Sequence, residues 1–195
     1  MIANWFDRIK TYVDWDLADR ARIAKLRRCL DSDLHEVVEA LGQQLVKFKG
    51  AQSLMSNARF VQRLHSVIRK WLVGLLEGTF DDEYVRMRLA FGRDLVAIDL
   101  TFEDVILLEE LARRQLFEFA REELRDNPHV LSSTMRTLEK AFNLDLALIY
   151  SAYLKVRDAK MERALLDRFL TVTGFSRTLY ENLVEARGMQ EGLGG

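Results

Sequence analysis

The chain contains a single proline, Pro128, in 195 residues. Proline is the residue that most strongly breaks helices, and the apolar–polar alternation typical of strands is not sustained anywhere in the sequence. Apolar residues instead recur every three or four positions along most of the chain. The sequence therefore predicts an all-α fold of about eight helices, with one helix at the N-terminus ahead of the main domain and a long helix towards the C-terminus.

Capping residues and glycines predict where several helices begin and end. Asn57 is a good N-cap, and Thr101 with Asp104 has the form of a capping box in which Asp replaces Glu. Gly78 predicts the end of one helix and Gly174 a break in a later one. Short turns should separate the helices, with longer connections only around Met55 and the single proline.

The firmest loop, Asp126–Pro128, should join two long antiparallel helices, Phe102–Leu124 and Leu131–Val156. The apolar seam of the second helix is longer than its neighbours in the chain need, which predicts that a second copy packs there as a four-helix bundle. Asp145 interrupts this seam as a buried polar contact or switch, or as a hydrated position at its edge. The residues expected at the dimer interface are Leu107, Leu111, Leu138, Phe142, Asp145, Ile149 and Tyr153.

The same pattern predicts how the chain is organised. Residues 1–14 form an N-terminal helix, 15–158 the main domain, 159–187 a helical extension or linker, and 188–195 a flexible glycine-rich tail. An output domain would lie on another chain or in a longer protein from which this domain derives.

Composition and charge exclude several classes of function. With 29 Lys and Arg against 30 Asp and Glu, the net charge of −1 does not suit a general nucleic-acid binder. No run of about 18 apolar residues predicts a membrane span, and the N-terminus does not resemble a signal peptide. We therefore expect a cytoplasmic protein that contacts neither nucleic acid nor membrane.

Residues that could support catalysis or metal binding are scarce. Cys29 is the only cysteine, which excludes an intrachain disulfide and a cysteine-based metal site, and we expect an ordinary reduced thiol. The sequence contains no nucleophile with its base, no phosphate-binding loop and no carboxylates at ligand spacing. Glu109–Glu110 and Glu122–Glu123 are interpreted as surface acids. We expect neither an enzyme nor a metal site.

Three stretches, in this order, resemble the globin domains of globin-coupled sensors and protoglobins. Arg63–Arg88 resembles the distal helix, its glycine stop and a Gly-x-Phe/Tyr-Asp-x-x-Tyr-x-x-x-Arg entry into the proximal helix. Phe91–Leu100 resembles the end of the proximal helix, and Leu144–Leu154 resembles the last globin helix. The resemblance spans about residues 15–185 and implies a globin fold for residues 15–158.

The residues that hold haem in that family are replaced. The matching position for the proximal histidine is Leu95, and no histidine stands between His65 and His129. The position matching the family's distal tyrosine is Gly42. The resemblance therefore implies a domain without haem, with His65 and Met87 as fallback ligands if haem is bound after all.

The interpretation is a haem-less sensor globin, as in bacterial stress-signalling assemblies, acting as a dimeric protein-interaction module. It would pass its signal to a downstream protein or a fused output domain. One alternative is a haem-binding gas (O₂) sensor with a non-standard axial ligand. Another is a sensor that holds an apolar ligand, such as a fatty acid, in the vacated cavity. His65 is also interpreted as a half-buried histidine without a ligand role, and His35 and His129 as solvated.

Overall fold

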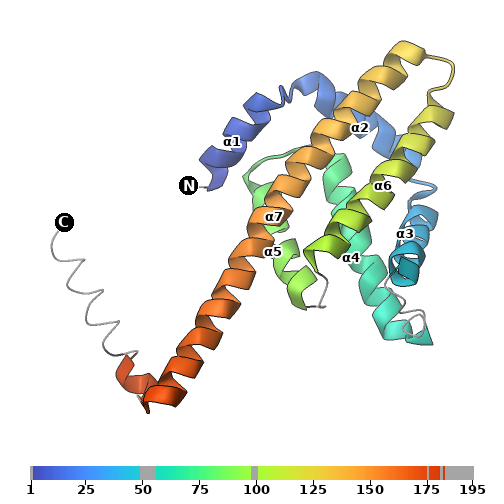
Figure 1. Ribbon diagram of the computed structural model, residues 1–195. Coiled ribbons are helices and arrows are strands. Elements are labelled where there is room, and N and C mark those ends of the chain that lie inside the picture. Colours follow the sequence, from blue (N-terminus) through green and yellow to red (C-terminus); the bar gives the residue numbers. More distant parts are fainter. Residues whose placement is uncertain (1, 49–55, 98–100, 175, 181, 183–195) are drawn as a thin grey trace. The chain divides into compact units, whose positions relative to one another are not determined.

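The computed structural model describes residues 2–48, 56–97, 101–174, 176–180 and 182, and these residues fold into helices joined by short turns (Figure 1). The all-α prediction is confirmed. The expected turn around Met55 and the expected tail from Gly188 lie outside the described residues. The helices are α1 (Ile2–Tyr12), α2 (Leu17–Leu30), α3 (Leu34–Phe48), α4 (Ala58–Glu77), α5 (Asp82–Ala97), α6 (Phe102–Glu123) and α7 (Pro128–Thr173).

The predicted capping residues lie where the sequence places them. Asn57 Oδ1 accepts hydrogen bonds from two backbone N–H groups in the first turn of α4, at 3.1 and 3.2 Å. Thr101 and Asp104 form a complete capping box at the start of α6. Gly78 ends α4 with φ 61°, and Gly174 follows α7 with φ 68°, in the left-handed region that favours glycine.

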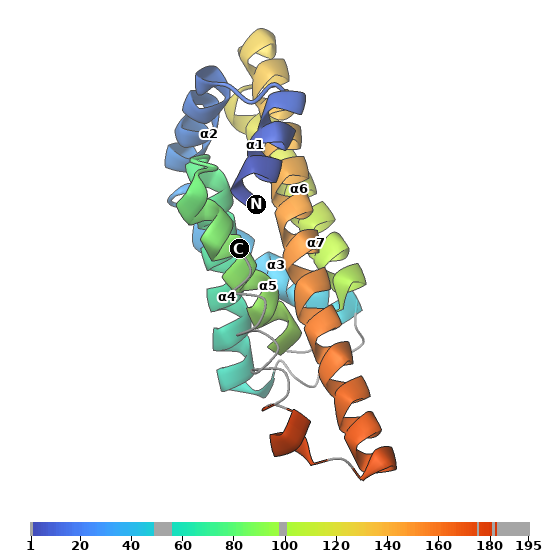
Figure 2. The same cartoon turned by 90° about the vertical axis from the view of Figure 1, so that its left-hand side faces the viewer.

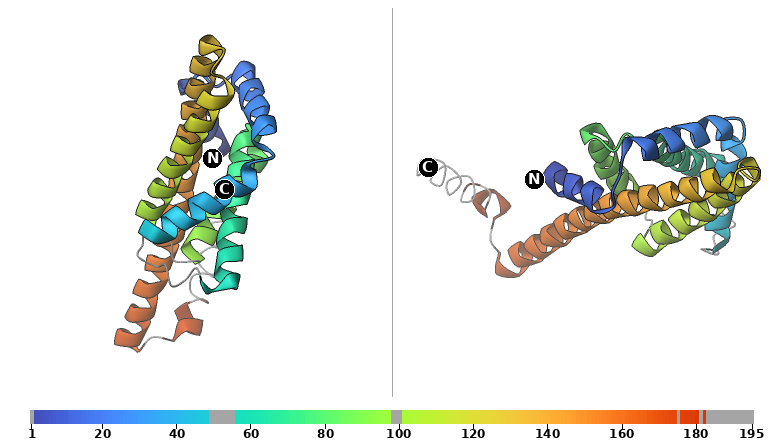
Figure 3. Two further views of the ribbon diagram at one scale, coloured as in Figure 1. Left: turned by 90° about the vertical axis from the view of Figure 1, so that its right-hand side faces the viewer. Right: turned by 90° about the horizontal axis from the view of Figure 1, so that it is seen from above.

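Helices α6 and α7 are antiparallel, as predicted, and move apart from the turn that joins them (Figure 3). The ring of Phe102 at the start of α6 lies 4.9 Å from that of Tyr150 and 5.8 Å from that of Tyr153. The predicted end of the second helix at Val156 is wrong. Helix α7 runs on to Thr173 and spans 46 residues from Pro128, because no proline or glycine interrupts it before Gly174.

The chain divides into two compact units between Tyr153 and Leu154, inside α7. In the first unit, α3 packs against both α4 and α6, and α2 packs against α4 (Figure 2). The apolar faces of the helices in this unit form one core that includes Trp71 of α4, Leu95 of α5 and Phe142 of α7. Among the described residues, no helix combines the length and the apolar character that a membrane crossing needs.

Candidate functional site

A charged cluster lies inside the first unit, centred on Asp145 of α7. The Asp145 carboxylate is completely buried, and its Oδ2 accepts a hydrogen bond from Trp71 Nε1 of α4 at 2.5 Å. Its Oδ1 accepts hydrogen bonds from the Tyr84 hydroxyl and from Arg88 Nε, both on α5. Arg88 Nη2 also donates to the backbone carbonyl of Trp71 at 2.9 Å. One carboxylate therefore connects three helices.

The buried charges of the cluster are balanced by partners inside the cluster itself. Burial works against the charge of Arg88, but the neighbouring Asp145 and Tyr84 raise the pKa of the guanidinium above its ordinary value. Burial also raises the pKa of the Tyr84 phenol well above its ordinary value. The site therefore contains a buried ion pair with its hydrogen bonds satisfied, the arrangement in which such a pair is tolerated. Of the two interpretations of Asp145, the buried polar contact is the one observed.

The interpretation of Glu109 as a surface acid is wrong, although Glu110 and Glu122–Glu123 are exposed as expected. Glu109 is only 3% exposed, and its Oε1 has no hydrogen-bond partner. Burial raises the pKa of Glu109 to about 8, and the charge of Asp145 adds to the effect. The core of this unit therefore contains a carboxyl group that keeps its proton near neutral pH.

The position that matches the family's proximal histidine lies deep in the core. Leu95 on α5 is 0% exposed, as are Leu41 on α3 and Ile68 on α4. The ring of Trp71 stacks on that of Phe91, with centroids 6.5 Å apart and planes 10° apart. The side chain of Leu95 is therefore fully shielded from solvent.

The position that matches the distal tyrosine is filled from α4. A Cβ atom at Gly42 would lie 2.9 Å from both Cδ2 and Nε2 of His65, so the imidazole occupies the space that glycine leaves open. His65 is half-buried, and its Nε2 is buried without a hydrogen-bond partner. Met87 is 41% exposed on α5, while His35 and His129 are exposed.

The residues expected at a dimer interface divide into two groups. Leu107, Leu111 and Tyr153 are partly exposed and accessible to a partner. The other four are covered by their own chain, so they support the fold from inside and offer no contact surface in this arrangement. These four are Leu138, Phe142, Asp145 and Ile149.

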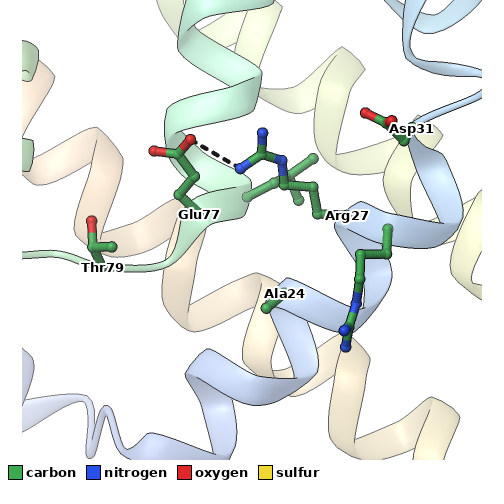
Figure 4. Close-up of a pocket in the computed structure, with 7 residues that line it drawn as sticks. Ala24, Arg27, Asp31, Glu77 and Thr79 are labelled. Carbon is green, nitrogen blue, oxygen red and sulfur yellow. Dashed lines mark hydrogen bonds and ion pairs between the residues drawn. The ribbon is translucent and has the colours of Figure 1, made fainter.

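A surface cleft lies between α2 and the end of α4 (Figure 4). Arg27 Nη1 and Glu77 Oε1 form an ion pair across it at 2.9 Å. The cleft is lined by Ala24, Arg27, Arg28, Asp31, Leu76, Glu77 and Thr79. In the part of the chain that the structure describes, no three His, Cys, Asp or Glu side chains lie close enough together to hold a metal ion.

The sequence did not reveal the partners of Asp145. Trp71, Tyr84 and Arg88 all stand in the stretch that resembles the family, but only as parts of a motif. One signal could have indicated this pair. Arg88 lies on an amphipathic helix, and Asp145 interrupts the apolar seam of another helix in the same chain. Two opposite charges at apolar positions of separate helices are a sign of a buried pair.

Comparisons with known proteins agree with the helical fold. The family model described as Protoglobin matches residues 3–159. The fold is similar to the globin domain of a Geobacter sulfurreducens globin-coupled sensor, with a TM-score of 0.65 and 17% sequence identity, over 75% of this chain and 96% of that chain. No curated protein matches the chain in sequence.

Proposed function

The chain belongs to the protoglobin family, and we propose that its globin domain is a signalling module. We propose further that this module works without haem. The observation that supports this most directly is Leu95, which stands where the resemblance places the iron-binding histidine. Haem iron is held by imidazole, thiolate, thioether or phenolate ligands, and a leucine side chain has no lone pair to donate.

The dense packing of this core also supports a domain without haem. The side chains of Leu41, Ile68 and Leu95 are completely covered by protein atoms, and the Trp71 and Phe91 rings stack between α4 and α5. A haem between these helices would have to displace close-packed core side chains, which protein interiors accommodate poorly.

One observation favours a second candidate, a haem-binding sensor that uses His65. Its Nε2 is buried and lacks a hydrogen-bond partner, and a neutral imidazole nitrogen is a common metal ligand. Against this candidate, the same imidazole fills the space above Gly42. Met87 is a weaker fallback ligand because it is partly exposed and has only a thioether to offer.

Titration of the purified full chain with hemin, followed by gel filtration and absorbance spectroscopy, separates the two candidates. If the module is haem-free, we expect no stoichiometric Soret band of bound haem in the protein fraction after gel filtration. A sharp, stoichiometric Soret band that moves with carbon monoxide would overturn the proposal. If that band is lost in His65→Ala but kept in the matched control His35→Ala, the second candidate holds.

The proposed signalling route is the association of two copies along the outer faces of α6 and α7. Leu107 and Leu111 are partly exposed there, and Ile106 and Tyr150 are each 46% exposed. Asp145 connects α7 to α4 and α5, so a change in how two copies pack would alter contacts inside each core. Small helix shifts at subunit interfaces are an established form of switching. A downstream protein or a fused output domain would receive the change.

Sedimentation velocity at micromolar concentration tests this interface. We expect a dimer whose dissociation constant rises by about tenfold or more in the double variant Ile106→Glu/Tyr150→Glu, because charged side chains are costly inside an apolar contact. Leu17→Glu is the matched control, since Leu17 is an exposed leucine on α2. A monomeric parent chain, or equal weakening in the control, would remove the interface.

A further inference from the structure

The second half of α7 presents a row of apolar side chains to solvent. Met161, Leu165, Phe169 and Val172 are 54, 62, 53 and 78% exposed. Their spacing of four, four and three residues places them on one face of a helix with about 3.6 residues per turn. Leu170, on the other side of the helix, is buried. Isolated exposed apolar residues are ordinary, but a continuous row marks an interaction surface.

Charged residues of opposite sign border this 161–172 stripe. Helical periodicity places Arg157 and Arg168 along one edge, and Glu162 along the other with Asp158 beside it. Arg157 and Glu162 are exposed, and neither forms an ion pair with any residue that the structure describes. Exposed Lys155 precedes Glu162 by seven residues on the same edge, so the complementary charges that border the stripe are Arg157 and Arg168 on one edge and Glu162 on the other.

This arrangement of charges selects one occupant and one orientation. When two identical helices pack in parallel, opposite edges meet, so the arginine edge of each copy faces the Glu162 edge of the other. When they pack antiparallel, like edges meet, and arginines would face arginines. Charged residues beside an apolar seam set partner choice and orientation in this way. We infer that the 161–172 stripe binds the same stripe of a second copy as a parallel, in-register helix pair.

Disulfide crosslinking of the full chain tests the orientation. Leu165→Cys and Val172→Cys are made separately in a Cys29→Ser background and treated with a mild oxidant. A parallel pair places each stripe residue beside its own copy, so both variants should form covalent dimers. An antiparallel pair can bring only a residue near the two-fold axis against itself. Arg163→Cys, exposed on the opposite face, is the control and should stay monomeric.

The outcomes are unambiguous. Crosslinking at both stripe positions without crosslinking of the control supports the parallel pair. Crosslinking at one stripe position alone, at neither, or equally at all three positions overturns it.

A charge reversal tests the edges independently. Arg157→Glu turns two favourable edge contacts into repulsive ones, so the concentration needed for half-maximal crosslinking of Leu165→Cys should rise about tenfold. The double change Arg157→Glu/Glu162→Arg should restore it, and failure to do so contradicts the edge pairing.

The stripe contact depends on neither the haem-free interior nor the α6–α7 interface. If crosslinking fails while the Ile106→Glu/Tyr150→Glu variant still loses a dimer, only the stripe contact is refuted.

Discussion

Replacing Glu109 by glutamine tests the description of the charged core. Glu109 is 3% exposed and lacks a partner for Oε1, and burial raises its pKa from 4.5 to about 8. Between these two pH values the folded chain keeps a proton that the unfolded chain has lost. The free energy of unfolding must therefore fall as pH rises through this interval, because the native state binds more protons than the unfolded one.

The size of the effect follows from the same interval. At 1.36 kcal/mol per pH unit, the step from 4.5 to about 8 corresponds to about 5 kcal/mol of stability lost by the parent chain. Glu109→Gln has no proton to lose, although its buried amide costs about 1–3 kcal/mol if it remains unpaired. The variant should thus be no more stable than the parent at pH 5 and about 2–4 kcal/mol more stable at pH 9.

Urea unfolding at pH 5, 7 and 9, followed by circular dichroism, measures this difference. Glu118→Gln is the matched control, since this side chain is exposed on the same helix and is not among the charges that raise the pKa of Glu109, so the pH dependence of the parent should stay unchanged. A difference between Glu109→Gln and the parent that is constant from pH 5 to pH 9 would refute the reasoning. Equal pH effects of both glutamine variants would refute it as well.

Two further changes test the contacts around the core. Asp145→Ala leaves the Arg88 guanidinium buried without its counter-charge and should lower the free energy of unfolding by about 3–5 kcal/mol, measured by urea unfolding. The exposed Asp158→Ala should cost little by comparison, and similar losses in the two variants would contradict the buried pair. Gly42→Ala places a Cβ atom 2.9 Å from the His65 imidazole and should cost about 1–3 kcal/mol. Adding His65→Ala should recover most of that loss, and an undiminished loss in the double variant would argue against this contact.

Local signals in the sequence predicted the helices well. Asn57, Thr101 with Asp104, and Gly78 act through hydrogen bonds within a few residues, so their meaning survives in any tertiary setting. The all-α class and the antiparallel order of α6 and α7 followed from periodicity and one tight loop. The fallback ligands and the absence of haem remain predictions, because they concern a group that only binding experiments test.

The core charges could not be predicted, because they depend on several helices at once. Glu109 has the spacing of a surface acid on an amphipathic helix, but α6 packs against α3 on one side and contacts α7 on another. Glu109 is buried because α6 packs on two sides, and the spacing of apolar residues along α6 alone does not indicate this. The same reason placed Leu138 and Phe142 inside the chain, where the seam had suggested an interface.

The three donors that share the Asp145 carboxylate restrict how α7 can move. A gradual slide of this helix would withdraw one oxygen after another from Trp71, Tyr84 and Arg88, and every intermediate position would leave a buried charge incompletely paired. Only positions with a full set of partners are low in energy. If α7 moves as the proposed signalling route requires, it should move between a few discrete positions, and the signal would then be all-or-none in each molecule and graded only across a population.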